Sequence, residues 1–369
     1  MDRKLSEILS GIRDVDKKVI HEAEKRMTSL AKPLNSLGKL EEMAIRLSGI
    51  TGKVKNKIEK KLVIIMCSDN GVVEEGIASS PQSVTLAQAI NFTKGLTGVA
   101  VIAKANCTEL KVIDVGINCD FKYEGILDRK IRKSTNNIKK GPAMSYNEAE
   151  KAILIGIEAA FEACDNGYEI IGVGEMGVGN TSTSSAMLAS LCDLNVEDVV
   201  GRGAGLTDEA LLKKVKVIEE AIKLNKPIKD DTIDVLSKLG GFDIGAMAGV
   251  FLGCAYKKVP VVIDGFISSV AALVAYRLNN KCRDYMFTSH ASKEIGFMAV
   301  MEELNLEPIL NLDMGLGEGS GCPISFNILD TACAVMNNMA TFEEAEIDDS
   351  YLDELKHEYA HKIWERWFR

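Results

Sequence analysis

Glu318 is the residue of this sequence whose surroundings point most directly to chemistry. It stands between glycines in the loop Leu316-Gly317-Glu318-Gly319-Ser320-Gly321. The pattern does not place it on a solvated helix face, and no cation is next to it in sequence. A carboxylate in this setting either caps a neighbouring loop or acts as a general base. We favour the general base and take Glu318 as the candidate catalytic residue.

A second carboxylate, Glu175, occurs in the similar segment Gly174-Glu175-Met176-Gly177, directly after an apolar run. Two carboxylates beside one ligand push each other's pKa values apart, so that one of them stays protonated. The sequence therefore predicts two carboxylates in different protonation states.

Several other glycine-containing loops follow apolar runs. Glycine lets backbone N–H groups approach a phosphate closely, and a helix N-terminus behind the loop favours negative charge. One such loop alone is equally typical of a tight turn without a ligand, but the set predicts a phosphorylated ligand. The loops span 68–72, 75–82, 172–181, 201–206, 264–266, 288–290 and 317–321.

Short apolar runs alternate with helical patterns through the middle of the chain. This alternation predicts an α/β fold with a parallel sheet buried on both faces. Ligands of such sheets bind beyond the carboxyl ends of the strands, where these loops lie. Both ends of the chain, by contrast, show helical spacing, interrupted by a loop at 32–38. The runs are 62–66, 110–115, 170–173, 259–263, 285–288 and 308–312.

Composition excludes several classes of protein. The formal net charge of -9 argues against a nucleic-acid binder, and 46% hydrophobic residues suffice for a large core. The nine cysteines are odd in number and include no Cys-x-x-Cys pair, which favours free thiols in a reducing compartment. Because no signal peptide or membrane span is recognisable, we expect a cytoplasmic protein without a membrane partner.

Two motifs match known patterns formally. Gly172-x-Gly174-x-x-Gly177 matches the dinucleotide fingerprint, but no aliphatic strand leads to Asp193 or Asp198, so a dehydrogenase is disfavoured. His357-Glu358-Tyr359-Ala360-His361 matches a zinc-hydrolase helix, but only eight residues follow it. We expect no metal and no cofactor.

The ordered motifs resemble those of the nicotinate-nucleotide–dimethylbenzimidazole phosphoribosyltransferase family over almost the whole chain. The resemblance rests on Lys32–Gly38, Ser68–Val72, Glu75-Gly76, Ser80-Pro81, Val84-Thr85, Ile113–Gly116, Gly174–Thr181, Gly240–Asp243, Asp264–Phe266, Ser289-His290 and Leu316–Gly321.

The resemblance implies a three-layer Rossmann-like core with a mostly parallel sheet, and a homodimer. It also implies a small helical domain from both chain ends (1–58 with 325–369) beside a large catalytic domain (59–324). The implied reaction moves phosphoribose from nicotinate mononucleotide to 5,6-dimethylbenzimidazole. Nicotinate and α-ribazole 5′-phosphate are formed, for cobalamin nucleotide-loop assembly, without a metal.

The resemblance also assigns roles to individual residues. Glu318 would take the proton of the incoming base, and Glu175 would approach the ribose or the base. The base would be lined by Ser80, Gln88, Met176 and Leu316, and the phosphate would meet Gly177, Gly179, Asn180, Lys214, Ser292 and Gly319. Met176 and Leu316 remain open to a plain core role, and Lys214 to a solvated one.

One position departs from the family. The family has Asp-His-Gly after its first strand, whereas this chain has Asp69-Asn70-Gly71. Asparagine forms hydrogen bonds but does not titrate near neutral pH. The enzyme could therefore use another phosphoribosyl acceptor, such as adenine, a substituted benzimidazole or a phenol.

A non-catalytic sensor of the nucleotide or the base is a different alternative. Retention of Glu318 argues against it, because a sensor would not need that carboxylate.

Overall fold

The computed structural model describes residues 4–120 and 122–352. This part of the chain divides into two compact units, one made of residues 4–13 and 60–325, the other of 14–59 and 326–352. Residues 4–13 belong to the larger unit, whereas the expected small helical domain (1–58 with 325–369) included them. Their helix α1 (Leu5–Gly11) packs on α11 (Phe242–Lys257), and Gly11 faces the ring of Tyr256. The His357–His361 motif lies outside the described residues.

The larger unit is built on a seven-stranded sheet in which every neighbouring pair is parallel. The predicted α/β fold is thus confirmed, and all six predicted apolar runs form strands. A seventh, β3, was not predicted, because its three residues are only partly buried and form no apolar run. The strands, in the order of the sheet, are β3 (Ile126–Asp128), β2 (Glu109–Gly116), β1 (Lys61–Ser68), β4 (Ile170–Met176), β5 (Val261–Ile263), β6 (Met286–His290) and β7 (Pro308–Leu310).

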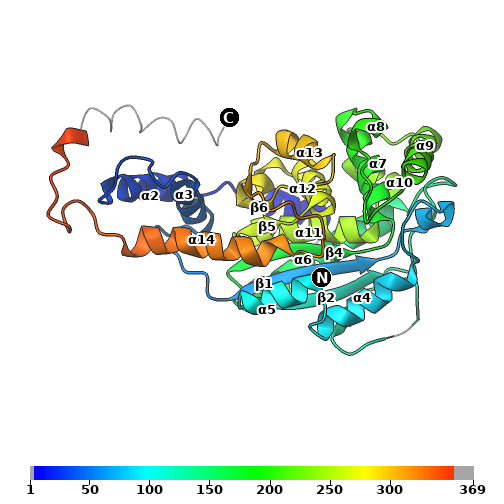
Figure 1. Cartoon of the computed structure of the whole chain (residues 1–369), viewed down its shortest axis with the longest axis horizontal. Coiled ribbons are helices and arrows are strands. Elements are labelled where there is room, and N and C mark those ends of the chain that lie inside the picture. The colour runs from blue at the N-terminus through cyan, green and yellow to red at the C-terminus, as the bar shows by residue number, and fades with distance from the viewer. Residues whose placement is uncertain (1–3, 121, 353–369) are drawn as a thin grey trace. The chain divides into compact units, whose positions relative to one another are not determined.

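Helices cover both faces of this sheet, as Figure 1 shows. Helices α4 (Ser83–Thr93) and α5 (Gly98–Ala105) contact β1 and β2 from one face. On the other face α11 and α12 (Phe266–Leu278) lie against the central strands, with α6 (Tyr146–Asp165) packed on α11. Connections between parallel strands are right-handed, so the direction in which the chain crosses the sheet decides which face its helices cover. The chain moves from β1 to β2 toward one edge of the sheet and from β4 to β7 toward the other edge, so the two sets of helices lie on opposite faces.

The crossing of α6 and α11 depends on glycine. A side chain on Gly156 would meet Ala246 O at 1.8 Å, and one on Gly249 would meet Ile153 O at 1.9 Å. Their absence lets the two backbones touch, so α11 lies as a rigid layer between α6 and the sheet. Helix α6 starts at a capping box in which Ser145 and Glu148 satisfy each other's backbone N–H groups.

The remaining helices of the larger unit form most of the connections after the strands. They are η1 (Gly71–Glu75), α7 (Asn180–Cys192), α8 (Val196–Val199), α9 (Asp208–Asn225), α10 (Thr232–Leu239), η2 (Asn280–Tyr285) and α13 (Phe297–Leu304); α14 (Gly321–Asn338) begins here and continues into the smaller unit.

The smaller unit is helical over its described residues, with α2 (Lys17–Ser29), α3 (Lys39–Thr51), the rest of α14 and η3 (Ser350–Leu352). The predicted loop before α3 is confirmed. Lys32 in this loop forms a buried ion pair with Glu41 of α3, with 2.8 Å between Nζ and Oε1. The same Oε1 accepts from Leu37 N at 2.9 Å. These contacts fix an irregular segment that has no regular backbone ladder.

Among the described residues one segment, Ser83–Ala105, is apolar and long enough by composition to cross a membrane. In the structure it is two helices, α4 and α5, separated by a turn. Val99 at the start of α5 donates its N–H to the carboxylate of Glu318. The segment is therefore part of the α/β unit.

Candidate active site

A cavity of about 350 Å³ opens at the carboxyl edge of the sheet. The strand order reverses between β1 and β4, and ligands of open parallel sheets bind beside such a reversal. Apart from Gly319, every residue predicted for the site lines this cavity. Those residues are Ser80, Gln88, Glu175, Met176, Gly177, Gly179, Asn180, Lys214, Ser292, Leu316 and Glu318.

Gly319 lies beneath the cavity floor. Its N–H donates to Asp264 Oδ2 at 3.0 Å, and a side chain there would collide with Val63 and Gly174. Its φ of +88° is a second reason for glycine. In this arrangement its N–H fixes the loop, so the predicted contact of Gly319 with the phosphate does not follow from its geometry.

Both carboxylate oxygens of Glu318 are held by donors. Gln88 Nε2 donates to Oε1 at 2.6 Å, and Val99 N in the first turn of α5 donates to Oε2 at 3.3 Å. The residue is 5% exposed, and the N–H of a helix N-terminus stabilises negative charge. The carboxylate is thus fixed, shielded and suited to accept a proton from a ligand in the cavity.

The backbone at Glu318 is unusual, since φ is +63°. A residue with a side chain rarely adopts this conformation, which is most often retained at functional sites. Asp264, after β5, holds the loop by accepting from Gly319 N and, at 2.7 Å, from Gly321 N. Burial raises the pKa of Asp264 to about 7, and the two N–H groups oppose that rise.

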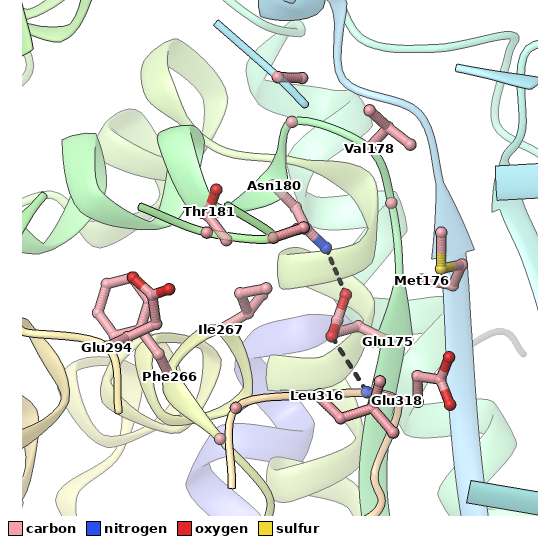
Figure 2. A pocket seen from close by; sticks show the side chains of 18 of the residues that line it. Glu175, Met176, Val178, Asn180, Thr181, Phe266, Ile267, Glu294, Leu316 and Glu318 are labelled. Carbon is pink, nitrogen blue, oxygen red and sulfur yellow. Dashed lines mark hydrogen bonds between the residues drawn. The ribbon is translucent and has the colours of Figure 1, made fainter. Parts of the chain in front are cut away.

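Glu175 is the second-last residue of β4 and lies beside Glu318, as Figure 2 shows. Its Oε2 accepts from Asn180 Nδ2 at 2.5 Å, and its Oε1 accepts from Glu318 N at 3.4 Å. Burial raises the pKa of Glu175 to about 8; the Asn180 hydrogen bond opposes this rise and the charge of Asp243 adds to it. Burial therefore favours the neutral form of Glu175.

The amide of Asn180 is shared between two carboxylates. Besides Glu175, its Nδ2 donates to Asp243 Oδ2 at 3.0 Å. Both hydrogens of that amide are thus engaged inside the protein, although sequence reasoning placed Asn180 against a phosphate. Its backbone at the start of α7 stays at the cavity wall.

Lys214 also lines the cavity. It extends from α9, is 1% exposed, and donates to Thr181 Oγ1 at 3.0 Å and to Gly201 O at 3.1 Å. An ammonium has three N–H groups, and no described residue engages the third. Burial lowers the pKa of Lys214 to about 8, opposed by the charge of Glu294. With α7 and Ser292, this part of the cavity suits an anionic group.

Met176 is partly exposed, and Leu316 is 54% exposed. Leu316 also contacts Gly98, whose missing side chain leaves room for it. The two residues are apolar walls of the opening and not enclosed core.

Sequence reasoning missed several lining residues. Asp264, Thr181 and Glu294 each lie in or near a loop that was noted for its glycines, but their side-chain roles depend on distant partners. For Asp264 the available signal was its position directly after a buried strand. Asn70 is fully buried and does not line the cavity; its Oδ1 accepts from Thr183 Oγ1 at 3.4 Å.

Comparison with known proteins identifies the family of this chain. A family model described as "Phosphoribosyltransferase" matches residues 12–347. Nicotinate-nucleotide–dimethylbenzimidazole phosphoribosyltransferase of Clostridium perfringens (strain 13) is 58% identical over 96% of this chain and 98% of its own length. The enzyme of the same name from Clostridium tetani is 48% identical over 94% and 96%.

A solved structure leads to the same family. The crystal structure of CobT from Thermus thermophilus superposes with a TM-score of 0.86 at 37% identity, covering 90% of this chain and all of the other. A family model over most of the chain, relatives of this identity and the shared fold all agree. The chain therefore belongs to the nicotinate-nucleotide–dimethylbenzimidazole phosphoribosyltransferase family.

Proposed function

We propose that this protein transfers the phosphoribosyl group of nicotinate mononucleotide to 5,6-dimethylbenzimidazole, as the names of its relatives state for them. The products are nicotinate and α-ribazole 5′-phosphate, used in cobalamin nucleotide-loop assembly. The observation that carries the proposal is Glu318, a buried carboxylate held by two donors, in one cavity with the buried lysine Lys214.

The reaction requires one proton acceptor. Nicotinate in the nucleotide is a pyridinium, so when its bond to ribose C1′ breaks, the electron pair neutralises the ring nitrogen. One benzimidazole nitrogen forms the new bond to C1′, and the proton of the other passes to Glu318. Because the leaving group starts as a cation, no strong general acid is needed.

Negative groups around the ribose stabilise the charge that develops. As the C1′ bond to nicotinate lengthens, the sugar takes on oxocarbenium character. Asp264 and Glu318 supply fixed oxygens near this position, shielded from water. Such preorganised charges stabilise a transition state more than they do in water.

The phosphate is assigned to the end of the cavity that contains Lys214, Ser292 and the start of α7. The third N–H of Lys214 and the backbone of Gly177 and Gly179 are the groups proposed to meet it, whereas the N–H of Val178 between them donates to Thr85 Oγ1. The base is assigned to the end formed by Ser80, Gln88, Met176 and Leu316. This direction places C1′ between Glu175 and Glu318.

The direct test is to incubate the protein with nicotinate mononucleotide and a panel of benzimidazoles, purines and phenols, and to identify products by mass. We expect nicotinate and α-ribazole 5′-phosphate, with 5,6-dimethylbenzimidazole the preferred acceptor. Glu318→Gln should reduce turnover by about 10² or more, the scale of general-base removal, while nucleotide binding is retained. Glu209→Gln, at the start of α9, is the matched control. Absence of nicotinate release with every acceptor would refute the transferase.

We also propose a cytoplasmic homodimer. Leu96 and Val101, in the apolar segment of α4 and α5, are 69% and 58% exposed, and a second copy would cover them. Light scattering should give twice the chain mass, and Leu96→Asp with Val101→Asp should give the monomer. The cysteines of the described chain are free thiols, in keeping with a reducing compartment.

A further inference from the structure

A row of buried polar side chains extends from Glu175 away from the cavity. Asn180 Nδ2 donates to Glu175 at 2.5 Å and to Asp243 at 3.0 Å, and so bridges the two carboxyl groups. Asp243, the second residue of α11, is fully buried and does not line the cavity. It therefore reaches the ligand only through Asn180 and Glu175.

The far oxygen of Asp243 has no partner among the described residues, and neither has Asn70 Nδ2. Buried polar atoms are rarely left without a hydrogen bond, so two in one place call for an explanation. A side chain on Gly241 would meet Asp243 Oδ1 at 2.2 Å and Asn70 Oδ1 at 2.6 Å. Both oxygens thus lie beside the same empty Cβ position of Gly241.

A half-turn of the Asn70 amide would address both groups. It would exchange Nδ2 and Oδ1, and so turn an N–H group toward the Gly241 Cβ position that Asp243 Oδ1 also borders. Thr183 tolerates the exchange, because its Oγ1 donates to Asn180 O at 3.0 Å and is then free to accept from Asn70. The polar row then runs without a break from Asn70 through Asp243 and Asn180 to Glu175.

We propose that Asp243, held by Asn70, is a positioning residue: its negative charge keeps Glu175 protonated, and the Asn180 amide that bridges the two carboxyl groups fixes the orientation of Glu175 in the cavity. The inference rests on the proposed function, because it gives Glu175 its state beside the ribose. A neutral Glu175 presents an O–H donor to the ribose or the leaving group.

The charges around the pair agree with this assignment. Burial raises the pKa of Asp243 to about 6 and that of Glu175 to about 8, so Asp243 loses its proton more readily than Glu175 does. The other titratable groups facing the pair are Asp264, Asp69 and the thiol of Cys67. Arg132 stacks on the ring of Phe242, next to Asp243.

The test is a double-mutant cycle that needs no substrate. Between pH 7 and 8 the folded protein holds a proton on Glu175 that the unfolded chain has lost, so Glu175 makes the melting temperature fall as pH rises. Asp243, with a pKa of about 6, has lost most of its own proton below this range. Asp243→Asn removes a neighbouring charge and lets Glu175 ionise roughly one pH unit lower. The fall should therefore be shallower in Asp243→Asn, but the substitution should not change the slope in a chain that already carries Glu175→Gln.

Asp114→Asn is the matched control, because Asp114 is a buried carboxylate near the end of β2 that contacts Lys130 instead of Asn180. It should leave the slope unchanged in both backgrounds. If Asp243→Asn does not fold, Asn70→Ala tests the same link, with a smaller change in the same direction. An equal slope change with and without Glu175→Gln, or no change in either background, would overturn the proposal.

A second measurement connects the cycle to catalysis. In Asp243→Asn, kcat/KM should begin to fall on the alkaline side at a pH roughly one unit lower than in the unsubstituted protein. The change should be larger in kcat than in KM. Because the melting experiment contains no substrate, it decides on the polar row even if nicotinate release were never observed. The two proposals can therefore fail separately.

Discussion

Gln88 Nε2 donates a hydrogen bond of 2.6 Å to Glu318 Oε1, although the two residues are 230 positions apart in the sequence. Helix α4 supplies the amide, and the loop after β7 supplies the carboxylate. The contact fixes the direction of one carboxylate oxygen of Glu318, so the geometry of the proposed general base depends on a helix that is distant in sequence.

Gln88→Ala should lower kcat between roughly ten- and a hundred-fold, because a hydrogen bond to a charged group contributes about 1.5–3 kcal/mol. KM for the nucleotide should change little, since Gln88 lies at the base end. Steady-state kinetics measure both values. Gln82→Ala is the control, because that amide bonds Asn70 O and Asn118 instead. An unchanged kcat in Gln88→Ala would show that Gln88 does not orient Glu318.

Lys214→Met should raise the Kd of nicotinate mononucleotide, because the cavity loses its buried cation. Burial lowers the pKa of Lys214 to about 8 in the unsubstituted protein, and the charged form is the one proposed to bind the phosphate. Affinity should therefore fall as pH rises through 8, and this dependence should vanish in Lys214→Met. Calorimetric titration from pH 6.5 to 9.5 checks both points. The exposed neighbour Lys213→Met should bind normally, and equal weakening in both variants would argue against a phosphate contact.

Gly174→Ala should displace the Glu318 loop. The added methyl group would lie 2.3 Å from Glu318 O and 2.8 Å from Gly319 N, so the backbone must move. We expect a loss of about 1–3 kcal/mol in unfolding free energy, the usual cost of overpacking, together with a large loss of turnover. Thermal melts and nicotinate release measure these. Gly141→Ala meets nothing within 4 Å and should behave normally. A fully active Gly174→Ala would mean that the loop adapts freely.

Asp264→Asn should loosen the same loop from the other side. The carboxylate accepts from both Gly319 N and Gly321 N, whereas an amide accepts only one of them. We expect kcat to fall roughly tenfold, the effect of losing one charged hydrogen bond. Because the pKa of Asp264 is about 7, kcat/KM of the unsubstituted protein should decline as pH falls below 7. A decline of the same shape in Asp264→Asn would assign that limb to another group.

Much of the fold follows from local sequence, because buried parallel strands must be continuous apolar runs. Six of the seven strands were found in this way, and the loop before α3 was found from its Pro and Gly. The exception, β3, is short and partly exposed, so no apolar run marks it. Its pairing with β2 supplies a stability that no local pattern encodes.

The sequence by itself singled out Glu318, because glycines on both sides leave a carboxylate without a helical or paired role. It also indicated the sheet edge at which the loops meet. Only the tertiary structure decided that Asn180 bridges two carboxyl groups, that Asp264 binds the Glu318 loop, and that Lys214 is buried instead of solvated. These are contacts between residues far apart in sequence, and the burial that shifts their pKa values exists only once the chain is packed.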